Sequence, residues 1–445
     1  MLKSKCFSKK SYVVIGMGKT GCSIYKSLIN SGAVVYFWED NPKHSKKILN
    51  KGYKKYSSKI SQIDYVIPSP GIATKGKSAH KLIKKLTSKN TKLISELDLF
   101  QIYLDNLNIR NQIKIIAVTG TNGKSTTVSL IHHILKKNKF NTVLAGNIGK
   151  PIFEAKMIKK GFYVLELSSY QLESSKIFQP DIACILNLTP DHLARHNTMS
   201  NYGNAKLNIF KNINSSQKGF FNNESIIKKL IKKNNHLSKM KNLKQINKNK
   251  KNSIKKLNEN QYNLLSNDQN YHFSYEILKE VGLSSNKIFN AFKSFRGLEF
   301  RQQIIFSDKK KLIINDSKST NYHSLIAALK KYKDIILICG GQIKSNNINI
   351  LDDSLGNIKK VIIIGEESNT FHKYFQSKVT TVYVHSLDKA VVEMSKFMKT
   401  NKDFNTFLFS PGAASFDQYN NFEERGRHFN CLLYTSDAAD EKVRG

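Results

Sequence analysis

Short runs of apolar residues, each closed by a glycine or a polar turn, alternate along this chain with stretches whose apolar positions recur at helical spacing. Short apolar runs of this kind are typical of strands buried on both faces, and the helical stretches between them provide the crossovers. The pattern therefore predicts an α/β protein built on parallel sheets. The expected strands are Tyr12–Ile15, Val34–Phe37, Tyr65–Ile67, Lys114–Val118, Tyr163–Leu167, Ile182–Leu186, Leu312–Ile314, Ile335–Cys339, Val361–Ile364 and Phe407–Phe409.

These strands fall into three blocks. The first reaches about Glu96, the second starts at Lys114, and the third starts at Leu312. A chain of 445 residues is long enough for two to four domains of about 100–200 residues, so we expect one domain for each block. Residues 431–445 contain several small and acidic residues and show neither a helical period nor strand alternation. We interpret this segment as a non-native tail.

The charge of the chain is strongly positive, with 72 Lys plus Arg against 33 Asp plus Glu, a formal net charge of +39. Such an excess is common in proteins that bind nucleic acid or anionic membranes. Only seven of the basic residues are arginine, however, and the lysines are spread over the whole chain. Because recognition of nucleic acid leans on the planar fork of arginine, we expect no nucleic-acid partner.

The cysteines and the apolar runs indicate in which cellular compartment the protein is expected. The five cysteines show neither a CxxC pair nor zinc-ligand spacing, as is usual in a reducing cytoplasm. The first apolar stretch is interrupted at Lys19, and no run approaches the roughly 18 residues that a membrane span needs. We therefore expect a soluble, cytoplasmic protein without a membrane partner.

The first expected strand leads into GMGKTG, residues 16–21, and Glu39 follows the second. Glycines in such a turn let backbone N–H groups and a helix N-terminus approach a diphosphate, while the acid meets a ribose hydroxyl. Taken alone, the motif fits an NAD site, a site for another nucleotide diphosphate, or a purely structural turn. A second turn, Ser69–Ile72, follows the third strand and is expected to face the same crevice.

The sequence TGTNGKSTT, residues 119–127, follows the fourth expected strand and precedes an apolar helix around Val128–Leu135. Its GKS segment matches the end of a phosphate loop, in which backbone amides cradle phosphates, the lysine neutralises charge and the hydroxyl reaches Mg²⁺. The spacing from Gly120 is two residues shorter than usual. The intact strand–loop–helix frame nevertheless favours a variant phosphate loop over an interpretation without phosphate.

Two more residues follow strands of the same block. Glu166 and His192 lie at or beyond strand ends, where a carboxylate and an imidazole could hold Mg²⁺ near phosphate oxygens. Ordinary capping or hydrogen-bonding roles fit the same positions. Lys206, taken alone, reads as a surface lysine.

Several ordered motifs resemble those of one family. They are TGTNGKSTT, AGNIG (145–149), VLELSSYQLE (164–173), LNLTPDHLARH (186–196), INDSKSTN (314–321) and SPGAASFDQYNNFEERG (410–426). Together they resemble the Mur ligases over nearly the whole chain, and most closely the member that adds D-glutamate to UDP-N-acetylmuramoyl-L-alanine. A sister ligase that adds a different amino acid is the alternative.

The resemblance implies three domains: an N-terminal Rossmann-like domain for the UDP substrate (1–97), a central P-loop ATPase-like domain (98–297) and a C-terminal Rossmann-like domain for the amino acid (298–430). It also implies ATP-dependent activation of a carboxylate as an acyl phosphate, which the amine of the amino acid then attacks. Two Mg²⁺ sites and a carbamate formed from CO₂ on Lys206 belong to this expectation, as does a monomeric state.

The resemblance assigns roles to residues by motif position. The implied catalytic residues are Lys124, Glu166, His192 and Lys206, and the implied metal ligands are Ser125, Glu166, His192 and carbamylated Lys206. ATP contacts are implied for Gly120, Thr121, Asn122, Gly123, Lys124, Ser125, Thr126, Asn270, Arg301, Asp316 and Lys318. UDP-substrate contacts are implied for Lys19, Thr20, Glu39, Ser69, Pro70, Gly71 and Asn147, and D-glutamate contacts for Thr320, Lys344, Ser415 and Phe422.

The chain departs from the family pattern at two positions. Ser266 and Phe300 stand where the family usually has histidine. Neither is a primary catalytic position, so we expect altered nucleotide contacts and retained activity.

Overall fold

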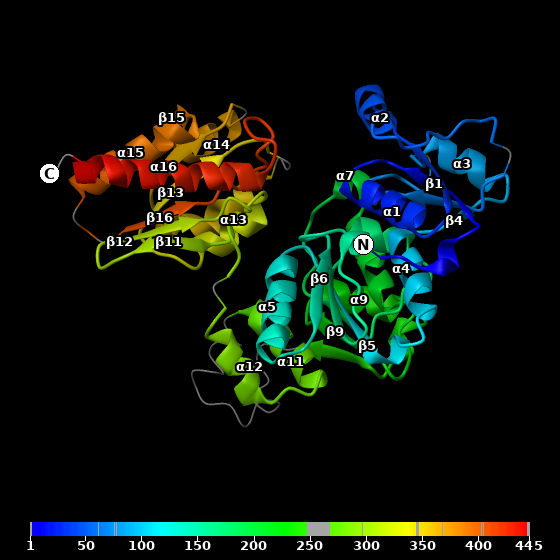
Figure 1. Ribbon diagram of the computed structural model, residues 1–445. Helices are drawn as coiled ribbons and strands as arrows, with labels where there is room; N and C mark the ends of the chain where they lie inside the picture. The colour runs from blue at the N-terminus through cyan, green and yellow to red at the C-terminus, as the bar shows by residue number, and fades with distance from the viewer. Residues whose placement is uncertain are drawn as a thin grey trace. The chain divides into compact units, whose positions relative to one another are not determined.

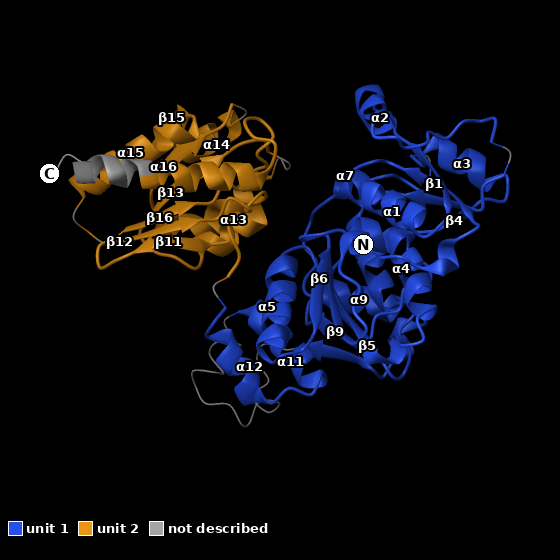
Figure 2. Ribbon diagram, viewed as in Figure 1, with its two compact units in different colours: residues 1–295 blue, residues 296–445 orange. Residues whose placement is uncertain are grey.

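The computed structural model describes residues 2–60, 62–74, 76, 78–246, 268–295, 297–343, 347–366, 368–401, 403 and 405–442. It forms two compact units, Met1–Phe295 and Arg296–Gly445 (Figures 1 and 2). Three sheets, flanked by helices, confirm the predicted α/β architecture. In the part of the chain that is described, no helix has the length and apolar character that crossing a membrane would require.

The first sheet has the strand order β2-β1-β3-β4, and all its pairs are parallel. Its central strands are the predicted apolar runs, whose side chains are buried over most of their length. The strands are β1 (Ser11–Ile15), β2 (Val34–Trp38), β3 (Tyr65–Pro68) and β4 (Lys92–Leu93), with helices α1 (Lys19–Asn30), α2 (Pro42–Leu49) and α3 (Lys81–Thr87).

The second sheet has the order β10-β9-β8-β5-β7-β6, again with parallel pairs throughout. Along β5, Ile116 and Val118 pack into one apolar core and Ile115 and Ala117 into another, because alternate side chains point to opposite faces. The strands are β5 (Ile113–Thr119), β6 (Thr142–Gly146), β7 (Gly161–Glu166), β8 (Ile182–Ile185), β9 (Lys218–Asn222) and β10 (Leu243–Ile246). The helices are α4 (Glu96–Asp105), α5 (Lys124–Lys137), α6 (Ser169–Ser174), α7 (Leu193–His196), α8 (Met199–Leu207), α9 (Ser225–Lys233), α11 (Gln269–Glu280) and α12 (Ser285–Phe292).

The first two sheets share one hydrophobic core, which explains why they form a single unit. Leu28 of α1, Phe100 of α4 and Phe153 of the short helix Ile152–Glu154 belong to the same buried cluster. Helix α4 packs on this short helix and on α6. The turns at the ends of the first sheet are therefore held in place relative to those of the second.

The third sheet, in the second unit, has the order β11-β12-β16-β13-β14-β15. Only β11, an edge strand, runs antiparallel to its neighbour among these described pairs. The strands are β11 (Gln303–Ser307), β12 (Lys311–Asn315), β13 (Ile335–Gly340), β14 (Ile358–Ile364), β15 (Thr381–His385) and β16 (Asn405–Phe409). The helices are α13 (Tyr322–Leu329), α14 (Asn369–Phe375), α15 (Leu387–Thr400) and α16 (Phe422–Lys442).

The end of the chain differs from expectation in one respect. Helix α16 continues through Cys431 to Lys442, although the sequence shows no helical period there. Leu433 is buried and Leu432 packs against the core of the unit, and these contacts hold the middle of the helix. The non-native origin of residues 431–445 and the domain boundaries 1–97, 98–297 and 298–430 stay predictions.

Glu96, the first residue of α4, has a buried carboxyl group in the interior of the first unit. Its side chain accepts a hydrogen bond of 3.1 Å from Nε2 of Gln171 in α6. Burial raises the pKa of Glu96 to about 7, against the opposing effect of its hydrogen bonds. The folded protein therefore prefers the protonated carboxyl at mildly acid pH.

Replacing Glu96 with glutamine is expected to flatten the pH dependence of stability. An unfolded glutamate titrates near pH 4.3, so between about pH 4.3 and 7 the native state binds more protons than the unfolded state. The contribution of this proton uptake to stability is complete below pH 4.3 and is lost as pH rises through 7. The free energy of unfolding of Glu96→Gln, relative to that of wild type, should therefore rise by about 2–3 kcal/mol from pH 5 to pH 8. Urea unfolding followed by fluorescence of Trp38, the single tryptophan of the chain, measures this in the first unit. Exposed Glu154→Gln serves as control, and an equal difference at both pH values would contradict the prediction.

Candidate active site

The loop between β5 and α5 has the geometry of a phosphate loop. Oδ1 of Asn187 accepts hydrogen bonds from the backbone N–H groups of Thr121 (3.0 Å) and Asn122 (2.8 Å). Asn187 follows β8, the strand next to β5, and so holds the loop in place. Gly123 has φ +81°, and a Cβ there would lie 2.2 Å from Oδ1 of Asn270. A glycine is therefore required at this position, and Asn270, predicted to contact ATP, lies directly against the loop.

Lys124, the first residue of α5, folds back over this loop. Its Nζ donates hydrogen bonds to the carbonyl oxygens of Gly120 (2.9 Å) and Thr121 (2.7 Å). The ammonium group is thus placed at the mouth of the loop, at the N-terminus of a fourteen-residue helix. Helix N-termini attract anions, so the positive charge of Lys124 and the backbone N–H groups of α5 both favour a bound phosphate.

The side chains of Ser125 and Glu166, both predicted metal ligands, are in direct contact. Oγ of Ser125 donates a hydrogen bond of 2.5 Å to Oε2 of Glu166, the last residue of β7. Nδ2 of Asn147 donates one of 2.8 Å to Oε1 of the same carboxylate. Asn147, which follows β6, was predicted only as a substrate contact, and its orienting role toward Glu166 was missed.

Lys206 is buried, and its interpretation as a surface lysine is wrong. Its exposed fraction is 2%, and Nζ donates to the carbonyl oxygen of Gly120 at 2.8 Å. The ammonium also lies 4.7 Å from the ring centroid of Tyr202, one helical turn earlier in α8. Burial, assisted by the charge of Lys124, holds the pKa of Lys206 well below its ordinary value, although Asp191 and Glu166 oppose the shift. The uncharged amine is the form that can react with CO₂.

His192 stands farther from its strand than expected, seven residues past the end of β8, where it caps the short helix α7. It has φ +53°, in the left-handed region. Its Nδ1 lies 3.1 Å from the hydroxyl of Tyr170, and its ring meets that of Tyr202 at a centroid distance of 6.3 Å. Tyr202 therefore contacts both His192 and Lys206.

The residues that could hold a cation belong to the segments around three neighbouring strands. Glu166 ends β7, Ser125 lies in the first turn of α5 after β5, and His192 and Lys206 lie further along the chain after β8. Strands β8, β5 and β7 are adjacent in the sheet. Among the described residues no cluster of three or more His, Cys, Asp and Glu side chains has the spacing to hold a metal. The oxygen donors Ser125 and Glu166 nevertheless suit Mg²⁺, and an anionic oxygen on Lys206 would complete the kind of donor set that this ion prefers.

Asn187, Tyr170 and Tyr202 were not predicted as site residues. Asn187 and Tyr170 lie inside the motifs that carry the family resemblance, and Tyr202 lies four residues before Lys206. The only signal available in the sequence was this adjacency, because their roles are contacts with other site residues.

The predicted UDP-substrate turns come together at the carboxyl ends of β1 and β3. Oγ of Ser69 donates a hydrogen bond of 2.5 Å to the carbonyl oxygen of Gly16, and Pro70 and Gly71 continue that turn. Glu39 accepts a hydrogen bond of 2.9 Å from the backbone N–H of Met17. Partial burial acts to raise the pKa of Glu39, but hydrogen bonds from Met17, Asn41 and His44 lower it overall. Lys19 and Thr20 open α1 beside this turn.

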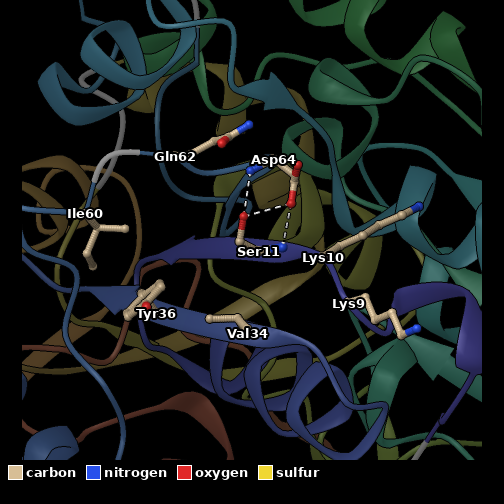
Figure 3. A pocket seen from close by; sticks show the side chains of 8 residues that line it. All are labelled: Lys9, Lys10, Ser11, Val34, Tyr36, Ile60, Gln62 and Asp64. Atoms are coloured by element: carbon tan, nitrogen blue, oxygen red, sulfur yellow. Dashed lines mark hydrogen bonds between the residues drawn. The ribbon is translucent and has the colours of Figure 1, made fainter.

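A pocket of about 320 Å³ lies at the opposite end of the same sheet (Figure 3). It is lined at the amino ends of the strands, by Lys10 and Ser11 at β1, Val34 at β2 and Asp64 before β3. Oδ2 of Asp64 accepts hydrogen bonds from the backbone and hydroxyl of Ser11, so its charge is already engaged. Because ligands of such sheets bind at the carboxyl ends of the strands, this pocket is not the predicted substrate site.

In the second unit, the predicted phosphate contact Asp316 follows β12 and is buried. It accepts hydrogen bonds from Oγ of Ser410 (2.8 Å) and from the backbone N–H of Gln302 (3.0 Å). Burial raises the pKa of Asp316 to about 7, partly offset by these hydrogen bonds and by the charges of Arg301 and Lys331. The neighbouring strand β16 ends beside β12, so Asp316 faces the loop that follows β16.

Three of the predicted D-glutamate residues, Thr320, Ser415 and Phe422, lie in the segments that follow β12 and β16. Nζ of Lys318 lies 4.0 Å from the ring centroid of Phe422, and Ser415, in the loop after β16, is 2% exposed. Thr320 is half-buried in the loop that carries Lys318. Lys344 and Ser266 lie outside the described residues. Phe300, the other departure, is buried with φ +60° and accepts a backbone hydrogen bond from Lys318.

Comparisons with known proteins agree with this geometry. The family model for the Mur ligase middle domain matches residues 118–286, which include the phosphate loop, Glu166, His192 and Lys206. The UDP-N-acetylmuramoylalanine–D-glutamate ligase of Rickettsia felis is 34% identical, over 96% of this chain and 97% of its own length. The enzyme of the same name from Prochlorococcus marinus is 32% identical, over 96% and 95%.

The fold is similar to that of solved ligases. The MurF ligase of Thermotoga maritima in complex with ADP aligns over 97% of both chains with a TM-score of 0.57 and 14% identity, a likeness of fold alone. With a third of its residues identical to a curated relative over almost its full length, the chain belongs to the Mur ligase family, among the UDP-N-acetylmuramoylalanine–D-glutamate ligases.

Proposed function

We propose that this chain joins D-glutamate to UDP-N-acetylmuramoyl-L-alanine by ATP-dependent formation of an amide, a step of peptidoglycan precursor synthesis. One observation carries the proposal. Nζ of Lys124 and Nζ of buried Lys206 both donate to the carbonyl oxygen of Gly120 after β5, and Ser125, next to Lys124, bonds to Glu166 at the end of β7. This is an arrangement for handling a terminal phosphate next to an anionic acceptor.

The chemical problem is that a carboxylate is a poor acyl donor, because its oxygen cannot leave. Attack of the substrate carboxylate on the γ-phosphate of ATP forms an acyl phosphate and releases ADP. The amine of D-glutamate then attacks the carbonyl carbon, and inorganic phosphate leaves as the amide forms. Both partners of the first step are anions, so positioning and charge neutralisation supply most of the rate enhancement.

The residues of the loop divide this work. Asn187 fixes the loop through the N–H groups of Thr121 and Asn122, so that the N–H groups of residues 123–126 cradle the phosphates. Lys124 neutralises charge as the phosphoryl group moves. Asn270 lies against Gly123 and contacts the nucleotide. In the second unit, Arg301, Asp316 and Lys318 are the proposed further ATP contacts.

Ser125, Glu166, His192 and carbamylated Lys206 would hold two Mg²⁺ ions. When bound, the ions neutralise phosphate and carboxylate charge together. Asn147 keeps Glu166 oriented toward Ser125 through its hydrogen bond to Oε1. Buried Lys206 presents an amine with a lowered pKa, and its carbamate would replace a repelling cation with an anionic ligand.

The substrate sites complete the proposal. Lys19, Thr20, Glu39 and the turn Ser69–Gly71 bind the UDP portion, and Thr320, Lys344, Ser415 and Phe422 bind D-glutamate. The enzyme acts as a cytoplasmic monomer. Its positive charge attracts ATP, a uridine diphosphate and a dicarboxylate, all of which are anionic.

Phosphate release from ATP tests this function. We expect release only when UDP-N-acetylmuramoyl-L-alanine and D-glutamate are both present with Mg²⁺. L-glutamate, L-lysine and meso-diaminopimelate, supplied in turn, should give no more than background. Turnover with one of these and none with D-glutamate would reassign the chain to a sister ligase.

A further inference from the structure

Phe300 and Gln302, near the start of the second unit, form a turn with two left-handed residues, whose φ angles are +60° and +48°. A positive φ is uncommon outside glycine, and for a side chain as bulky as phenylalanine it is a strained conformation. Such a conformation persists only where the surrounding contacts enforce it. The contacts of this turn therefore indicate what it holds in place.

Both residues of the turn bond to the loop that follows β12. The carbonyl oxygen of Phe300 accepts a hydrogen bond of 2.9 Å from the backbone N–H of Lys318. The backbone N–H of Gln302 donates one of 3.0 Å to Oδ1 of Asp316. Because Asp316 and Lys318 are proposed ATP contacts, the position of the turn bears on both.

The ring of Phe300 packs against helix α16 at Gly426. Phe300 is 4% exposed, and a Cβ added to Gly426 would lie 2.4 Å from Cδ1 and 2.6 Å from Cγ of the ring. Real Cβ contacts do not come so close, so the ring can occupy this position only because residue 426 is glycine. A phenylalanine ring has no polar atom, unlike an imidazole, so its contribution at this position is steric.

Helix α16 also bonds directly to the end of β12 and the loop that follows it. Nδ2 of Asn315 donates a hydrogen bond of 2.8 Å to the carbonyl oxygen of Gly426. Oγ of Ser317 donates one of 2.9 Å to the carbonyl oxygen of Phe422. The turn, the loop and the first turns of α16 thus form a closed set of contacts, in which the ring of Phe300 separates the turn from the helix.

We propose that Phe300 is a positioning residue for Asp316 and Lys318: its ring, wedged against Gly426, fixes the turn that bonds to both residues. The ring acts by its shape, and a histidine, the usual residue of the family at this position, would fill similar space. This inference rests on the proposed ATP contacts of Asp316 and Lys318.

Kinetics of variants at position 300 test this role. Phe300→Leu keeps an apolar side chain but loses the flat ring, and it should raise the KM for ATP by about tenfold or more. The KM for UDP-N-acetylmuramoyl-L-alanine should stay at the wild-type value. Phe300→His keeps a ring and should keep the KM for ATP close to wild type. Phe375→Leu, at a buried phenylalanine of α14 in the same unit, is the matched control and should leave both constants unchanged. An unchanged KM for ATP in Phe300→Leu, or an equal rise in Phe300→His, overturns the proposal.

Gly426→Ala tests the same contact from the helix. Alanine is ordinarily more favourable than glycine inside a helix, so a harmful effect here has to come from the collision with Phe300. Gly356→Ala, at an exposed glycine with open space around it, is the control. In full-length protein without ATP, the backbone amide of Lys318 should exchange with deuterium faster in Gly426→Ala and Phe300→Leu than in wild type.

Exchange at the wild-type rate in either of these two variants overturns the proposal. Mass spectrometry of the peptide that contains Lys318 measures it, without any need for ligation. Absence of ligation in wild type would defeat the proposed function instead, while the exchange measurement would still decide whether the ring holds the loop.

Discussion

Replacing Lys206 with alanine is expected to reduce ligation by at least about 10²–10³-fold, the scale on which a preorganised charged group at a reacting centre acts. The side chain is 2% exposed and its Nζ donates to the carbonyl oxygen of Gly120, so the group that is lost lies inside the site. As a carbamate it would supply an anionic oxygen beside Glu166. Alanine removes both the amine and any carbamate formed on it.

The control for this variant is Lys211→Ala, an exposed lysine five residues further along the chain. It should keep the wild-type rate. A short-chain carboxylic acid added to Lys206→Ala offers oxygen ligands in place of the carbamate, and partial recovery would identify the missing group as a carboxylate. Ligation at the wild-type rate by Lys206→Ala, with no added acid, would refute the carbamate role.

Replacing Lys124 with alanine is the second change with a large expected effect. The Nζ of Lys124 sits over the loop, bonded to the carbonyl oxygens of Gly120 and Thr121, where the phosphates of ATP would lie. Its loss leaves the charge of the transferring phosphoryl group without this counterion, which should lower the rate of phosphate release by about 10²–10³-fold. Backbone amides of the loop remain, so ATP should still bind, although more weakly.

The matched control is Lys137→Ala, at the other end of the same helix and exposed. Both variants should unfold at the wild-type urea concentration, as followed by Trp38 fluorescence, because the side chain of Lys124 is not part of the apolar core. Phosphate release by Lys124→Ala within a few-fold of wild type would show that this loop does not handle the terminal phosphate.

Most of the central strands could be predicted because parallel sheets bury both faces of their strands. Ile335–Gly340 and Ile182–Ile185, for example, are buried at every position, and a continuous apolar run is the direct consequence. The strands β4, β6, β9, β10, β11 and β15 were missed, and all but β9 are edge strands. Most residues of β11 and β15 are half-buried or exposed, as at Ile304, so their composition resembles that of loops.

The site could be predicted where its chemistry is local in sequence and could not where it depends on packing. The phosphate loop, with Lys124 and Ser125, is one continuous segment with a recognisable frame. The burial of Lys206 brings it into contact with Thr119 and Gly120, which are 87 and 86 positions away, and no pattern around Lys206 signals it. The hydrogen bond of Asn147 to Glu166 likewise joins two strands that only the sheet brings together.

The most direct measurement of the central claim uses the phosphate-release reaction with ¹⁸O in the carboxylate of UDP-N-acetylmuramoyl-L-alanine. If the chain activates that carboxylate as an acyl phosphate, one labelled oxygen must leave with the phosphate for every amide formed with D-glutamate. Mass spectrometry of the released phosphate should therefore show one ¹⁸O per turnover. Unlabelled phosphate alongside a full yield of amide would contradict the account.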